Sequence, residues 1–194
     1  MTFQQLQNFG VKEIIIKSMK NLILTFALLI VFIACDKDDN KPKTELEKLP
    51  PATQTGAQTF GCLIDGKAFI PAKFGSNAPR AFYQFVGSSY TLGISAGKGG
   101  GTELQNVIFG GVDIAALNEY SYSLKSQQSG NFFALYNLNT ITKSTNDEIP
   151  GTLKITHFDN TNFIISGKFE FSVIDNNGKQ INITDGRFDL NFTN

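Results

Sequence analysis

The chain has 194 residues, with 17 basic and 17 acidic side chains, so its formal net charge at neutral pH is zero. Residues 1–34 are expected to be absent from the mature protein, and without them fourteen basic and sixteen acidic residues remain, so the net charge is about −2. Neither balance provides the basic footprint of a nucleic-acid-binding protein, and nucleic acid is therefore not expected as a partner.

The first predicted element is an export signal in residues 19–34. Lys17 and Lys20 precede an almost unbroken apolar run over residues 22–34, and the run ends on the small residue Ala34. As a helix this run would be roughly 20 Å long, shorter than the roughly 30 Å hydrocarbon core of a bilayer. The pattern therefore favours a cleaved signal peptide over a transmembrane anchor.

The apolar run leads into Phe32-Ile33-Ala34-Cys35, which resembles the lipobox of bacterial lipoproteins, although Phe32 stands where Leu or Val is usual. The resemblance implies that Cys35 is diacylated on sulfur, exposed by cleavage and acylated again on its new amino group. Each buried CH₂ contributes about 0.8 kcal/mol, so three acyl chains would hold the protein on the membrane almost permanently. The membrane is thus an expected partner through Cys35.

The four residues after this cysteine, Asp36, Lys37, Asp38 and Asp39, resemble the acidic surface-export signal of Bacteroidetes lipoproteins. That resemblance implies an outer-membrane lipoprotein displayed at the cell surface. Two alternatives remain. An Asp directly after the cysteine resembles the inner-membrane retention signal of enteric bacteria, which would leave the protein facing the periplasm. A solvated charge run could also serve only to extend the tether.

The chain is therefore divided into four parts. Residues 1–18 precede the second methionine and are expected to be untranslated or lost, and residues 19–34 are the signal peptide. Residues 35–57 carry charges, prolines and small polar side chains, which predict a lipidated, disordered tether. Residues 58–194 form the folded domain.

The second cysteine, Cys62, lies among apolar residues and is predicted to be a small buried hydrophobe. A disulfide between Cys35 and Cys62 is the rival interpretation, since the chain has only these two cysteines.

Both ends of the predicted domain carry a second resemblance. The sequences LPPATQTG at residues 49–56, TFGCLIDGK at 59–67, ISGKFEF at 165–171 and ITDGRF at 183–188 resemble a group of small, uncharacterised Bacteroidetes lipoproteins. The group brings no established activity, so this resemblance supports the location and implies no mechanism.

The domain is predicted to be all β, an antiparallel β-sandwich of about ten short strands, with a lipocalin-like β-barrel as the alternative. Asp65-Gly66 predicts a tight hairpin between two strands. Further strands are expected at 81–86, 89–96, 104–110, 120–125 and 131–138, and alternation of apolar and polar residues is clear in 89–96. Residues 113–117 are expected to form one helical turn.

The strongest pattern lies at the C-terminus, where apolar residues share odd positions from Phe163 to Ile183 and even positions from Phe188 onward. We expect a bend at Gly167, a turn at Asn177-Gly178, and a β-bulge near residue 185 with Gly186 at positive φ.

No catalytic set emerges from the sequence. The glycine-rich segment 93–101 lacks the spacing of a phosphate-binding loop and is expected to be a flexible hairpin loop. His157 is the only histidine and has no partner pattern. The Asp- and Asn-rich segments 159–162 and 175–178 offer oxygens that suit calcium, but Asx turns are the favoured interpretation.

We therefore expect a protein that is not an enzyme and has no cofactor or metal: a surface lipoprotein that binds a glycan or a protein ligand. Its five tyrosines, Tyr83, Tyr90, Tyr120, Tyr122 and Tyr136, could supply a binding face or could belong to the core. A carrier of a small apolar ligand, a structural envelope component and an enzyme of unrecognised type are the alternatives.

Overall fold

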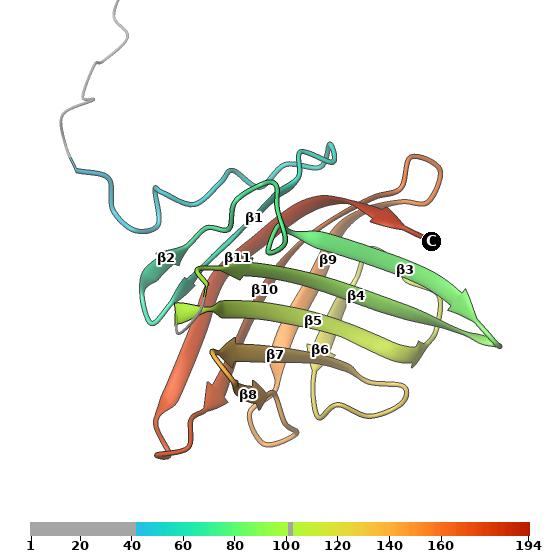
Figure 1. The fold of residues 1–194 in the computed structure, drawn as a ribbon. Helices are drawn as coiled ribbons and strands as arrows, with labels where there is room; N and C mark the ends of the chain where they lie inside the picture. Colours follow the sequence, from blue (N-terminus) through green and yellow to red (C-terminus); the bar gives the residue numbers. More distant parts are fainter. Residues whose placement is uncertain (1–41, 101–102) are drawn as a thin grey trace, which may run out of the picture. The chain divides into compact units, whose positions relative to one another are not determined.

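A computed structural model of the chain describes residues 42–100 and 103–194, in which a compact unit spans Lys43 to Asn194 (Figure 1). The signal peptide and the residues Cys35, Asp36, Lys37, Asp38 and Asp39 lie outside the described residues. The unit is built from eleven strands: β1 (Thr59–Ile64), β2 (Lys67–Phe69), β3 (Arg80–Val86), β4 (Ser89–Lys98), β5 (Gln105–Ile114), β6 (Ser121–Leu124), β7 (Phe132–Leu138), β8 (Ile141–Ser144), β9 (Gly151–Asp159), β10 (Ile164–Ile174) and β11 (Gln180–Thr193).

The strands hydrogen-bond in the order β10-β9-β6-β7-β5-β4-β3-β11. A further pairing of β10 with β11 joins the two ends of this order, so the eight strands form a ring. Strands β1 and β2 extend from β11, and β8 extends from β7 (Figure 1). Most pairs are antiparallel, but β11 with β3 and β6 with β7 make short parallel contacts. The prediction of an all-β, sandwich-like fold is confirmed. Within residues 42–100 and 103–194, no helix reaches the length and apolarity that a membrane crossing requires.

The space inside the strands is filled by phenylalanine rings. Phe109 on β5 lies 4.7 Å from Phe169 on β10 and 5.4 Å from Phe188 on β11, measured between ring centroids. Phe60 on β1 adds a ring 5.2 Å from Phe169. All four side chains are buried. Alternation of inward and outward residues brings these distant phenylalanines to one core, leaving polar side chains on the outer face.

The predicted β1–β2 hairpin is confirmed. Asp65 and Gly66 both have positive φ, 47° and 77°, as a two-residue type I′ turn requires. The Asp65 carboxylate accepts a hydrogen bond from the Asn182 backbone N–H at 2.9 Å, which ties the turn to β11.

The predicted bulge in β11 is present, with a different residue in the left-handed conformation. The register between β10 and β11 shifts between Phe169 and Phe171, and Asp185, at φ 53°, takes the conformation that we expected of Gly186. Asp tolerates that conformation better than most residues. Gly186 is required for space instead, because a Cβ there would lie 2.5 Å from the Phe169 carbonyl oxygen.

Two local predictions are wrong. Residues 113–117 form no helical turn, because β5 continues to Ile114 and the Asp113 carboxylate binds the hydroxyls of Ser89 and Ser129 at 2.8 and 2.9 Å. Residues 93–98 are not part of a loop either. They belong to β4, and Gly93 is a close-contact position because the Phe82 ring of β3 lies directly over it.

The folded unit also begins earlier than the predicted boundary at residue 58, so the expectation of a disordered tether is wrong for residues 43–57. Leu49 is buried, and residues 53–57 are hydrogen-bonded to β11. We call residues 49–57 the strap. Its composition predicted disorder, but the partner that orders it is an aspartate far away in the sequence.

Cys62 is fully buried on β1, as predicted, and makes no disulfide among the described residues. Burial raises the pKa of its thiol to about 12, so the sulfur remains protonated and unreactive at neutral pH.

Candidate functional site

The outer face of β9, β10 and β11 carries three cations side by side. Lys168 on β10 lies opposite Lys154 on β9 and opposite Arg187 on β11, so the three form a row across adjacent strands. We call these three residues the cation row. Neighbouring strands are about 4.8 Å apart, so the row is about 10 Å long. Like charges that face each other across strands repel one another, and binding of an anion to the row would reduce this repulsion.

Within residues 42–100 and 103–194, no acidic side chain forms an ion pair with this row. The ion pairs among the described residues join Lys48 to Glu45, His157 to Glu119 and Lys179 to Asp65, and none of them involves the row. The only hydrogen bond that a cation-row side chain makes to the described protein runs from Arg187 Nε to the backbone oxygen of Asp185 at 3.2 Å. That bond holds the guanidinium and leaves its two terminal nitrogens available to a ligand.

The row lies in a pocket of about 380 Å³, within the usual range for small-ligand sites. Besides the cations, its lining includes Thr152 from β9, Glu170 from β10, Asp185 from the bulge and Ala52 from the strap. The strap therefore forms a wall of the pocket. The lining combines three positive and two negative side chains, all contributed by the outer face of one sheet region and its covering segment.

The buried carboxylate of Asp189 lies beside the cation row on β11, and its oxygens already accept hydrogen bonds from the protein. It lies two residues after Arg187 on β11, is fully buried and accepts hydrogen bonds from the strap and from β10. The donors are Thr53 Oγ1 at 2.6 Å, the backbone N–H groups of Thr55, Gly56 and Ala57 at 2.9, 2.8 and 3.1 Å, and Ser166 Oγ at 2.8 Å.

Burial acts to raise the pKa of Asp189, but the hydrogen bonds from Thr53, Thr55, Ala57 and Ser166 outweigh burial and lower the pKa to about 2. Asp189 is therefore charged at neutral pH, and its charge is used to fasten the strap. The strap covers Asp189 and leaves the neighbouring cation row open.

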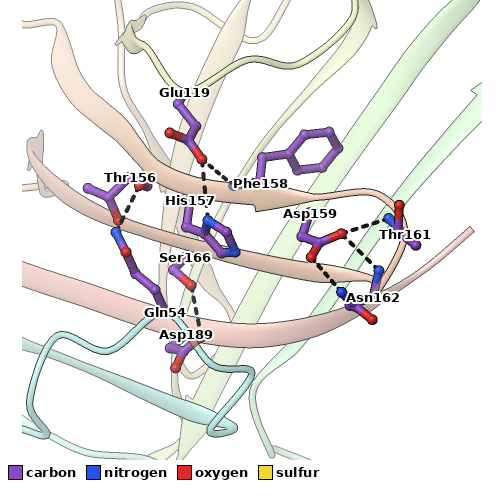
Figure 2. A network of polar contacts seen from close by, with 10 residues as sticks. All are labelled: Gln54, Glu119, Thr156, His157, Phe158, Asp159, Thr161, Asn162, Ser166 and Asp189. Carbon is purple, nitrogen blue, oxygen red and sulfur yellow. Dashed lines mark hydrogen bonds and ion pairs between the residues drawn. The ribbon is translucent and has the colours of Figure 1, made fainter.

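Figure 2 shows the polar contacts beside the strap, including His157. Nδ1 of this histidine lies 3.3 Å from Glu119 Oε1, and the same carboxylate oxygen accepts the Phe158 N–H at 3.1 Å. Ser166 lies opposite His157 in the sheet, but its buried hydroxyl donates to Asp189 (Figure 2). His157 does not line the pocket that contains the cation row. The cluster is accounted for by structural hydrogen bonds.

Both Asp- and Asn-rich segments form the predicted Asx turns. Asp159 Oδ1 accepts the backbone N–H groups of Thr161 and Asn162 at 2.8 and 2.9 Å, and Asp175 Oδ1 accepts those of Asn177 and Lys179 at 2.8 Å. Hydrogen bonds from Asn162, first from its side chain and then from its backbone, lower the pKa of Asp159. These carboxylates therefore stabilise turns.

The five tyrosines do not form one face. Tyr83 and Tyr136 are buried, and the Tyr83 hydroxyl accepts the Leu117 N–H at 2.8 Å. Tyr90 stacks on Tyr83 with their ring centroids 4.8 Å apart, and the exposed Tyr120 contacts Tyr122 with ring centroids 5.8 Å apart. Core packing explains Tyr83 and Tyr136, as one of the two interpretations of the sequence predicted.

Sequence reasoning missed the cation row. The alternation of apolar and polar residues in the sequence placed Lys168 on the outward side of its strand. Its alignment with Lys154 and Arg187, however, depends on the registers of two strand pairs. Comparison of the chain with protein-family models, with curated proteins and with solved structures found no match, so the geometry of the row carries the functional argument.

Proposed function

We propose that this protein is a non-catalytic, lipid-anchored binding protein of the cell surface, which holds an anionic ligand on the cation row. The observation that supports the ligand class is the row of three cations on adjacent strands, which form no ion pair with the described part of the chain and lie in a pocket of about 380 Å³. The core filled by phenylalanines supports binding on the outer face rather than inside the ring of strands.

The anchor comes from the sequence. Acylation of Cys35 would attach the mature chain to the outer membrane, and Asp36, Lys37, Asp38 and Asp39 would direct it to the outer leaflet. A Cys35→Ser chain is expected to leave the membrane fraction, and replacement of the four following residues by alanine is expected to make the protein inaccessible to protease added to intact cells. A Cys35→Ser chain that remains in membranes would contradict the anchor.

The ligand class is tested by charge reversal in the full chain. Lys154→Glu with Lys168→Glu should weaken binding to an anionic polymer by at least about tenfold, because two attractive charges become repulsive. Lys98→Glu with Lys125→Glu is the matched control, since both lysines are exposed and lie outside the pocket. Equal binding by the two double variants would refute the cation row as the site.

A further inference from the structure

The pocket also contains hydrogen-bonding oxygens, which belong to Thr152, Glu170 and Asp185. Along β10, Glu170 follows Lys168 by two residues and so projects from the same outer face about 7 Å away. Thr152 on β9 lies opposite Glu170, and Asp185 lines the same pocket from the bulge of β11. A row of hydrogen-bonding oxygens thus runs beside the cation row.

The two carboxylates are available to a ligand. Neither Glu170 nor Asp185 forms an ion pair with the cations beside it or with another basic side chain of the described residues. Their side chains also accept no hydrogen bond from the protein among the contacts found in the described residues, and both are exposed. Ionised carboxylates accept hydrogen bonds and cannot donate them, so their preferred ligand groups are hydroxyls or amines.

We propose that the ligand is an acidic sugar chain, in which carboxylates bind the cation row and neighbouring hydroxyls donate to Glu170 and Asp185. This inference rests on the proposed function, because it names the ligand class of the same site. A sugar acid carries an anionic group and hydroxyl donors a few ångströms apart, which matches two rows about 7 Å apart. Every polyanion is repelled by the two carboxylates, but a polyphosphate has no hydroxyl donor that offsets this repulsion, and poly-glutamate has only its backbone N–H groups.

Arg187 can hold the acidic group of the sugar at two points. Its Nε is engaged by the Asp185 backbone oxygen, which fixes the plane of the guanidinium and presents its terminal nitrogens as a fork. A planar carboxylate accepts two parallel hydrogen bonds from such a fork. Ala52 of the strap gives the pocket a small apolar wall, against which the C–H face of a sugar ring can pack.

The test measures binding of the full chain to four probes by calorimetry: trigalacturonic acid, its methyl ester, dextran sulfate and poly-glutamate. We expect trigalacturonic acid to bind most tightly and the methyl ester to bind at least tenfold more weakly, because esterification removes the charge and keeps the hydroxyls. Poly-glutamate binding more tightly than trigalacturonic acid, with dependence on Lys168, would overturn the sugar inference. Dextran sulfate binding more tightly would overturn the assignment of a carboxylate as the acidic group. Either result would leave the proposed function standing. No probe binding would overturn both.

The Glu170→Gln variant separates the two roles of the carboxylate. If Glu170 accepts sugar hydroxyls, the variant should bind trigalacturonic acid several-fold more weakly and poly-glutamate more tightly, because a hydroxyl acceptor is weakened and a repulsive charge is lost. Glu148→Gln, an exposed position outside the pocket, is the control. Tighter binding of both probes by Glu170→Gln would show that the carboxylate only repels anions, and would overturn the inference.

Discussion

Asp189→Asn tests how the strap is held on the sheet. The depression of the Asp189 pKa from 3.8 to about 2 means that the folded state favours the charged carboxylate by roughly 2 kcal/mol. Asparagine removes the charge and one acceptor oxygen, and it points an amide N–H₂ toward strap donors such as the Gly56 N–H, which lies 2.8 Å from Asp189 Oδ1. Each buried donor left unsatisfied costs about 1–3 kcal/mol. We therefore expect a loss of about 3–4 kcal/mol of unfolding free energy at neutral pH.

The assay is urea unfolding of the full chain as a function of pH. Because the pKa of Asp189 is lower in the folded than in the unfolded protein, its contribution is present above about pH 4 and is lost as the pH falls toward about 2. The wild-type protein should therefore lose roughly 2 kcal/mol more than the variant over this interval. Asp185→Asn is the matched control, since Asp185 is exposed on the same strand and asparagine also tolerates its positive φ.

A variant as stable as the wild-type protein, or equal losses of stability by both between about pH 4 and pH 2, would refute the argument that the buried charge fastens the strap.

Three further outcomes follow from the packing. Gly186→Ala should cost about 2–3 kcal/mol in urea unfolding, because its Cβ would lie 2.5 Å from the Phe169 carbonyl oxygen. Gly178→Ala, at an open turn, should cost about 1 kcal/mol from its positive φ alone, and equal costs would contradict the steric argument. Phe109→Ala should cost about 3–5 kcal/mol by the same assay, and a small loss would mean that its neighbours refill the space. Cys62 should resist alkylation at neutral pH until the chain is unfolded, as located by peptide mapping; labelling of the native protein would show that β1 opens.

The C-terminal hairpin shows how far local pattern reaches. Alternation placed the apolar side chains of residues 163–183 on one side, and the change of parity near residue 185 predicted the bulge that the register shift confirms. We assigned the positive φ to Gly186 because glycine is the usual residue in that conformation, but Asp185 adopts it. Position 186 is glycine for a different reason: the Phe169 backbone lies where a side chain at that position would be.

The strap shows where composition misleads. Prolines and small polar residues predicted disorder through residue 57, and by themselves such residues bury too little apolar surface to order a chain. A buried carboxylate on β11, 136 residues beyond Thr53, supplies the missing stabilisation through hydrogen bonds. No local signal could have linked the two segments.

The sequence by itself determined the β class, the Asp65-Gly66 hairpin and the inward side of the long C-terminal strands, because turn residues and a period of two act over a few neighbouring positions. Only the tertiary structure decided which strands are neighbours. That pairing aligns Lys154, Lys168 and Arg187 into one row and delivers the strap to Asp189. Both features arise from contacts between residues far apart in the chain, whose registers are set by the packing of the whole core.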